Sequence, residues 1–279
     1  MGRKKTPQEG GQLAEGYRKR KIPATRLVGM EMVDIGMRTH YVSGLLEVDV
    51  TEARRIVGDS KARGTRVSFT AWIIRCLAVA ARDFPEVNAF RKGRNLYLFE
   101  NVNVGMPIER EFEGELVPLP YLIRDCNTKS VLEITREIDS AKESGAEQGM
   151  VIGDRHSAAI AKISRWLPAP LRRLGARVFM RNPVRKQETM GAVVITAVGM
   201  FGKTGGWPLP IPIGHPLAVA VGGISRKPAY IGDGDRLEPR ELLDVTLMFD
   251  HDVIDGGPAT RFSARLVELM ESAYGLQQL

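Results

Sequence analysis

Two short, densely apolar segments bounded by glycine constrain the fold of this chain more than any other feature. They are Gly191–Val198 and Leu217–Val221, and both consist largely of valine, isoleucine, leucine and alanine. A continuous apolar run of this length between glycines is typical of a strand in the interior of a sheet, where both faces are covered. We therefore expect two central strands here.

Helical and extended patterns alternate around these two strands. Ser68–Phe84 is apolar at helical spacing on most faces, which predicts a buried helix that ends before Pro85. Ser130 and Glu133 have the spacing of a capping box and open a second helix. The other predicted elements are helices at Thr51–Arg63, with Thr51 as N-cap, Ser130–Ser144 and Thr260–Tyr274, and strands at Tyr41–Val50, Leu96–Phe99, Asn101–Met106, Glu115–Leu119 and Asp244–Phe249.

This order of elements, without an internal repeat, predicts a mixed α/β domain. The chain has 279 residues, enough for one large core, and no linker divides it. Residues 1–21 are polar and basic without periodicity, so we expect a flexible arm followed by one domain at 22–279. The two cysteines exclude a disulfide framework, and Cys76, in an apolar run, is expected to be buried.

The net charge of +7 comes from one segment. Residues 155–187 hold nine Lys and Arg and no Asp or Glu, which exceeds the excess of the whole chain. No nucleic-acid-binding signature accompanies this segment, so nucleic acid is not an expected partner. The N-terminus has no apolar core typical of a signal peptide, and no apolar run is long enough to cross a bilayer. We expect a cytoplasmic protein.

The basic segment 155–187 also carries apolar stripes. These are Ile160, Ile163, Trp166 and Leu167, followed by Leu171, Leu174, Val178 and Phe179. Such a segment can lie on an anionic membrane as a peripheral contact, bind an acidic partner, or meet phosphates. The simpler interpretation, which we favour slightly, is a solvated helix packed on the domain. His156, in this segment, and His40 and His215 elsewhere lack the spacing of metal ligands, and no metal site is predicted.

A histidine follows the last predicted strand. In Phe249–Gly256 (FDHDVIDG), His251 lies where the chain leaves the sheet, four residues before Asp255. Histidine can accept a proton near neutral pH, and a thiol needs such a base because its thiolate is the nucleophile. His251 is therefore a candidate general base. On spacing alone, the alternative is that His251 ends a strand and Asp255 caps the next helix.

Asp250–Gly256 resembles the D-H-x-x-x-D-G signature of the chloramphenicol acetyltransferase-like superfamily. The chain is most similar to the catalytic domain of the dihydrolipoamide acyltransferases of 2-oxo acid dehydrogenase complexes. Further segments resemble that family in the same order; these are Thr39–Thr51, Phe84–Asn88, Asn101–Ile108, Gly114–Asp125 and Gly191–Gly202.

The resemblance implies a chloramphenicol acetyltransferase-like two-layer α/β sandwich with a mixed sheet. It also implies a homotrimer, or multiples of trimers, with active sites at subunit interfaces. His251 would deprotonate the thiol of coenzyme A, which is a substrate, or of a dihydrolipoyl group. Asp255, followed by Gly256, would support the histidine loop by pairing with an arginine, for which Arg38 is the candidate; an ordinary surface charge is the alternative for Arg38.

Three positions depart from the family pattern. The serine that donates to the tetrahedral oxyanion falls on Thr196, which keeps the hydroxyl but adds a methyl group. A threonine is equally natural as an ordinary strand residue there. The usual asparagine becomes Ala197, and the arginine after the catalytic histidine becomes Asp252. These changes bear on the substrate and the partner rather than on the base.

About twenty residues precede the catalytic region, too few for the lipoyl and subunit-binding domains of full acyltransferase components. We therefore expect the acyl group to reach a lipoyl group on a separate carrier protein, or another acceptor. Two alternatives remain open. One is a small-molecule O-acetyltransferase of the chloramphenicol type, and the other is a non-catalytic oligomeric scaffold; the retained His251, Asp255, Gly256 and Thr196 favour the enzyme.

Overall fold

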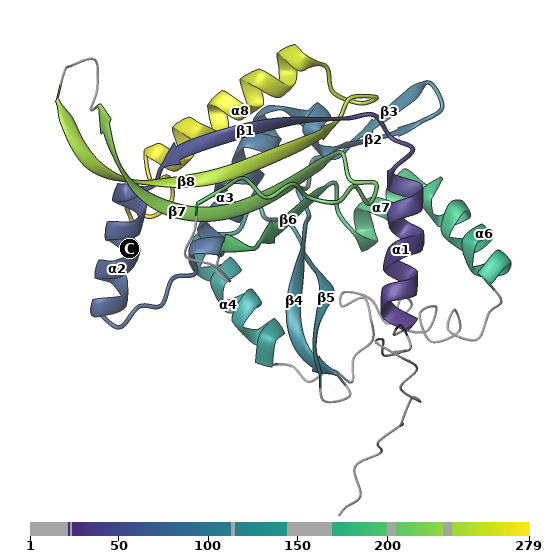
Figure 1. Ribbon diagram of the computed structural model, residues 1–279, viewed down its shortest axis with the longest axis horizontal. Helices are drawn as coiled ribbons and strands as arrows, with labels where there is room; N and C mark the ends of the chain where they lie inside the picture. Colours follow the sequence, from purple (N-terminus) through teal and green to yellow (C-terminus); the bar gives the residue numbers. More distant parts are fainter. Residues whose placement is uncertain (1–21, 23, 113–114, 144–168, 200–204, 231–235) are drawn as a thin grey trace, which may run out of the picture.

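The computed structural model describes residues 22, 24–112, 115–143, 169–199, 205–230 and 236–279 (Figure 1). The arm expected at 1–21 and the first part of the basic segment lie outside the described residues. The helices are α1 (Ala24–Gly36), α2 (Thr51–Ala62), α3 (Phe69–Asp83), η1 (Pro85–Asn88, a 3₁₀ turn), α4 (Val131–Glu143), α6 (Ala169–Met180), α7 (Pro183–Thr189) and α8 (Gly256–Glu271). The strands are β1 (Tyr41–Asp49), β2 (Ala89–Lys92), β3 (Asn95–Leu98), β4 (Val104–Phe112), β5 (Glu115–Ile123), β6 (Val193–Ala197), β7 (Leu217–Tyr230) and β8 (Leu237–Asp250).

Six strands form one mixed sheet in the order β1-β8-β7-β6-β4-β5. Strand β6 runs parallel to both of its neighbours, whereas all other pairs in this sheet are antiparallel. Strands β2 and β3 form a separate hairpin. The predicted α/β class and the two central strands, β6 and β7, are therefore confirmed.

One face of the sheet is covered by helices α2, α3, α4 and α8 (Figure 1). Alternate residues of β8 point into this layer, and Leu243, Val245, Leu247 and Phe249 belong to the core. Helix α3 is buried on most faces, as its sequence predicts, and its Trp72 indole donates a hydrogen bond to the Tyr274 carbonyl at 3.0 Å. Cys76 is buried beside it, as expected.

The opposite face of the sheet is crossed by an extended, proline-rich segment, Gly205–Pro216, which we call the strap. The Gly206 amide donates to the Asp244 carboxylate at 2.5 Å, and the Trp207 indole donates to the Leu46 carbonyl at 2.7 Å. These two bonds fix the strap to β8 and β1. Its outward side chains include Trp207, Leu209 and Ile211, of which Leu209 is 70% exposed.

Several boundaries differ from the sequence-based expectation. Thr51 is not an N-cap; it is the first residue of α2, and its amide and hydroxyl both donate to Asp49. The capping box is confirmed, because Ser130 and Glu133 exchange hydrogen bonds with each other's amides. Pro183 follows the end of α6 and begins α7, where a missing amide costs nothing. Among the described residues, no helix is both long and apolar enough to cross a membrane.

Candidate active site

The turn after β8 holds His251 at the end of an interior strand. The His251 amide donates to the His40 carbonyl at 2.7 Å, and the Asp250 amide donates to the Pro216 carbonyl at 2.9 Å. The Asp250 side chain then accepts the Asp252 amide at 2.9 Å, which closes the turn. Three hydrogen bonds thus fix the chain around His251, while the residue itself is exposed. This is the rigid mounting that a general base requires.

The carboxylate of Asp252 lies beside one histidine and one arginine. It is 3.0 Å from Nδ1 of His40 and 3.9 Å from the Arg91 guanidinium. Both partners are largely exposed, so each contact contributes little to stability. The contacts orient Asp252 toward β1 and β2, beside the turn that carries His251.

A cluster of buried titratable groups lies beneath the turn. Lys186 of α7 places its ammonium 3.8 Å from the centre of the Phe90 ring, and burial lowers its pKa to about 8. Burial also raises the pKa of Asp250, whose charge in turn favours the charged form of Lys186. Sequence reasoning missed this cluster, because Lys186 is one of many basic residues in its segment and its partners come from distant segments.

His215 and Tyr41 complete the cluster. His215 is 3% exposed, and its Nδ1 donates to the Gly191 carbonyl at 3.0 Å. Burial lowers the pKa of His215 to about 4, so its side chain is neutral at pH 7. The Tyr41 hydroxyl donates to the His215 carbonyl at 3.0 Å, and burial raises the pKa of Tyr41. His215 thus joins the strap to Gly191, two residues before β6, and to β1.

Thr196 lies on β6 and is half-buried. It is opposite Ala220 of β7, which is opposite Thr246 of β8, so the three residues form one row across the sheet. His251 comes five residues after Thr246, which corresponds to roughly 16 Å along the strand, in addition to the width of two strand spacings. One chain therefore does not bring Thr196 and His251 together.

The remaining predicted site residues surround the start of α8 and the end of α1. Asp255 is the N-cap residue of α8 by position, but its side chain makes no capping hydrogen bond. Gly256 is the first residue of that helix. Arg38 is exposed, and within the described part of the chain no ion pair joins it to Asp255. The pairing of Arg38 with Asp255 stays a prediction.

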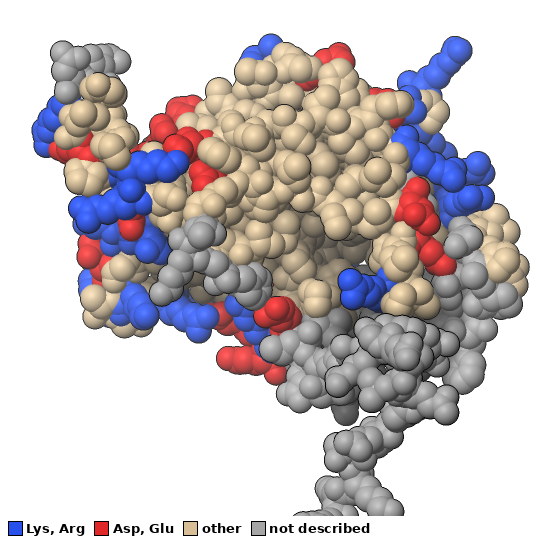
Figure 2. Space-filling model, in the orientation of Figure 1, with Lys and Arg blue, Asp and Glu red and all other residues tan. Residues whose placement is uncertain are grey.

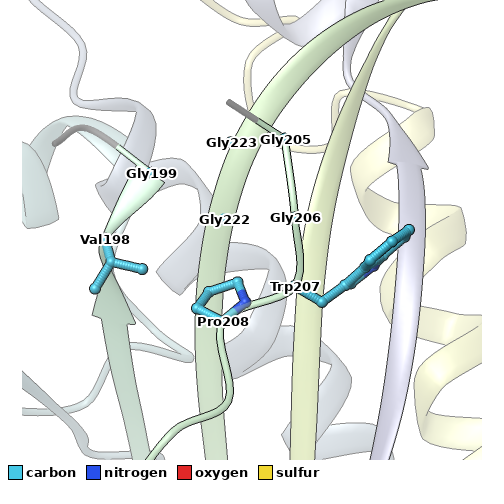
Figure 3. A pocket seen from close by; sticks show the side chains of 8 residues that line it. All are labelled: Val198, Gly199, Gly205, Gly206, Trp207, Pro208, Gly222 and Gly223. Carbon is cyan, nitrogen blue, oxygen red and sulfur yellow. The ribbon is translucent and has the colours of Figure 1, made fainter. Parts of the chain in front are cut away.

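A glycine-rich cavity of about 310 Å³ lies beyond Thr196, at the end of β6 (Figure 3). It is lined by Val198, Gly199, Gly205, Gly206, Trp207, Pro208, Gly222 and Gly223. The side chains of Val198 and Pro208 border the hollow, whereas the Trp207 ring points away toward β1. Side chains are scarce here, so backbone groups form much of the wall. In the described ranges, no group of three or more His, Cys, Asp or Glu side chains could hold a metal ion.

Solved structures of acyltransferase cores share the fold of this chain. The catalytic cubic core of the pyruvate dehydrogenase multienzyme complex aligns with a TM-score of 0.66 and 21% identity, covering 97% of this chain and 99% of that one. A dihydrolipoamide acetyltransferase from Azotobacter vinelandii aligns with a TM-score of 0.68 and 20% identity, covering 97% and 99%. The chain therefore has the fold of the acyltransferase cores.

Sequence comparison identifies the family within this class. The family model for the 2-oxoacid dehydrogenases acyltransferase (catalytic domain) matches residues 22–161 and 170–277, and the chain belongs to this family. A similar curated protein is the dihydrolipoyllysine-residue succinyltransferase component of the 2-oxoglutarate dehydrogenase complex of Staphylococcus saprophyticus, which is 24% identical over 262 residues. The match covers 91% of this chain and 51% of that protein. Its counterpart in Staphylococcus aureus is 25% identical over the same shares. The chain thus spans about half the length of these relatives.

Proposed function

We propose that this protein transfers an acyl group between coenzyme A and a dihydrolipoyl group, with His251 as general base. The observation that carries the proposal is the position of His251: it is exposed at the end of β8, in a turn held by three hydrogen bonds, in a chain of the acyltransferase family. Both substrates are thiols or their thioesters, and only the thiolate of such a group attacks efficiently.

The proposed reaction proceeds through a tetrahedral intermediate. His251 takes the proton of the attacking thiol, and the sulfur forms a bond to the thioester carbonyl carbon. The Thr196 hydroxyl donates a hydrogen bond to the oxyanion that results. The intermediate then collapses, the original carbon–sulfur bond breaks, and the imidazolium of His251 returns its proton to the leaving thiolate. General-base catalysis of this kind contributes about 10²–10⁴-fold in rate.

The separation of His251 from Thr196 supports a site shared between two subunits. We propose that the chain forms a homotrimer, or multiples of trimers, in which Thr196 of one subunit faces His251 of another. The strap side chains Trp207, Leu209 and Ile211 offer an exposed apolar surface for such a contact. Figure 2 agrees, because the middle of the molecule in this view is largely free of charged side chains.

The acyl group that we propose is succinyl, because the similar curated proteins from Staphylococcus act as succinyltransferase components. The lipoyl group would be carried by a separate protein, and coenzyme A would be a substrate rather than a bound cofactor. A cytoplasmic location is part of the same proposal.

The test measures thiol release from succinyl-, acetyl- and propionyl-coenzyme A with dihydrolipoamide as acceptor. We expect the His251→Ala variant to lose about 10²-fold or more in kcat. Thr196→Val should lose a comparable amount, because its shape is retained but the donor is absent. Thr196→Ser is the matched control and should stay close to the native rate.

Unchanged turnover in the His251→Ala variant would contradict the assigned base. Turnover with a hydroxyl acceptor but not with dihydrolipoamide would instead identify an O-acyltransferase. If an intact oligomer transfers no acyl group and binds no coenzyme A, the scaffold alternative is correct.

A further inference from the structure

Helix α6 exposes an apolar stripe that nothing in the described chain covers. Leu171, Leu174 and Val178 are 54%, 57% and 57% exposed. At 100° per residue, these three side chains lie within an arc of about 60° around the helix axis, so they form one continuous surface. Three large apolar side chains side by side are unusual on a surface that remains in water.

The other side of α6 already packs on the protein. Ala176, Phe179 and Met180 are half-buried, and Met180 contacts the strap at Gly214. Figure 1 places the helix at the outer edge of the molecule, next to α1 and α7. The helix thus packs on the domain through this other side, and its stripe remains exposed.

Positive charge accompanies the stripe. Arg177, Arg181 and Arg185 are exposed, and none of them forms an ion pair with a described carboxylate. Residues 155–187 contain no acidic residue at all. In Figure 2, Lys and Arg (blue) gather at the right-hand edge, above the uncharged surface of α6, whereas acidic side chains lie over α1. Val184 of α7, 46% exposed, extends the apolar surface among the arginines.

We propose that α6 and the start of α7 form a peripheral docking surface for an anionic lipid bilayer. The apolar stripe would enter the boundary between headgroups and acyl chains, and the arginines would meet lipid phosphates. The apolar stripe beside the arginines favours a bilayer over an acidic protein. An acidic protein would pair with the arginines but would also need a matching apolar surface for the stripe. The proposal does not depend on the acyl transfer proposed above.

The experiment is sedimentation of the full-length protein with vesicles of phosphatidylcholine alone or mixed with phosphatidylglycerol. We expect binding to the anionic vesicles only, and weaker binding at higher salt. The double variant Leu174→Glu/Val178→Glu should bind the anionic vesicles at least tenfold more weakly. The matched control is Leu237→Glu, because Leu237 is 55% exposed at the far end of the sheet; it should bind like the native protein.

Equal binding of the double variant and the native protein would overturn the proposal, as would equal binding to neutral and anionic vesicles. Light scattering of the same samples without lipid measures the oligomer mass. If the double variant changes that mass and the native protein binds no vesicles, the stripe is an interface between copies of this chain instead.

Discussion

His215 makes the stability of the fold depend on pH. Its hydrogen-bond partners lie far from it in the sequence. The native fold holds its imidazole buried and neutral, with a pKa of about 4, whereas an unfolded chain has an ordinary histidine pKa near 6.5. Its Nδ1 donates to Gly191, and its carbonyl accepts from Tyr41, so it lies between β6 and β1. The sequence suggested only an ordinary polar residue, because burial depends on the strap that covers it.

The stability of the protein should therefore fall as the pH decreases from about 6.5 to 4. In this window the unfolded chain binds a proton at His215 and the folded chain does not, so protonation favours unfolding. Between pH 7 and pH 5 the difference amounts to about 2 kcal/mol. Urea unfolding at both pH values, on native protein and on His215→Gln, measures it. The variant should lose about 2 kcal/mol less than the native protein over this interval, and equal losses would show that His215 is not the responsible group.

The site residues divide into those that sequence can find and those that it cannot. His251 is predicted from a short motif next to a strand end, and Thr196 from the resemblance of its strand to the family pattern; both roles stay predictions. Lys186, Asp250 and Tyr41 act together only because α7, β8 and β1 meet in space. No spacing rule links residues that are so far apart in the chain, so their cluster required the structure.

At the scale of elements, the connection from α7 to β6 depends on one glycine. Gly191 has a φ of +73°, a conformation that other residues adopt at a cost, and a Cβ atom there would approach the Asn103 carbonyl too closely. The tight turn lets β6 enter the sheet between β4 and β7 directly after the helix. The sequence identified this glycine only as the boundary of an apolar run.

Replacing Gly191 by alanine should destabilise the protein by at least about 2 kcal/mol, because strain and the clash with Asn103 add together. The same substitution at Gly58 is the control. Gly58 is exposed in the interior of α2 with open space around it, so Gly58→Ala should stabilise by about 0.5–1 kcal/mol. Urea midpoints at one protein concentration compare the two variants. A neutral Gly191→Ala would show that the turn relaxes without cost.

Element types were easier to predict than element ends, and the reasons are physical. Periodicity is carried by many residues, as in α3, so the buried helix is found reliably. Strand length depends on pairing instead: β7 and β8 extend well beyond their apolar cores because they support each other as a long hairpin. Helix α7 was not predicted, because its seven residues are too few for a clear periodic pattern; its proline stands in the first turn, which accepts proline.

At the scale of the whole molecule, the order of the strands in the sheet could not be predicted from the sequence. Nothing in the pattern places β8 between β1 and β7, yet this order separates His251 from Thr196. The resemblance to a trimeric family implied active sites at subunit interfaces. The strand register supports that expectation, because it keeps Thr196 and His251 of one chain far apart. A hydroxyl and an imidazole roughly 16 Å or more apart along the sheet cannot both act on one carbonyl group.

A complementation experiment tests this shared site directly. His251→Ala and Thr196→Val chains are each expected to be nearly inactive alone. If every site takes His251 from one subunit and Thr196 from a neighbour, subunits mixed in equal amounts, unfolded and reassembled together give some interfaces with both groups intact. Random assembly gives an intact pair at roughly a quarter of the sites, because each of the two contributing subunits is the right one half of the time.

The mixture should therefore recover roughly a quarter of native turnover, provided that assembly is random and closed. The two variants mixed without unfolding provide the control: no activity should return there as long as each oligomer keeps its own subunits. A reassembled mixture that stays as inactive as its components would mean that His251 and Thr196 act within the same chain, or not together. Recovery would instead place the catalytic unit in the oligomer, because neither variant chain carries both groups.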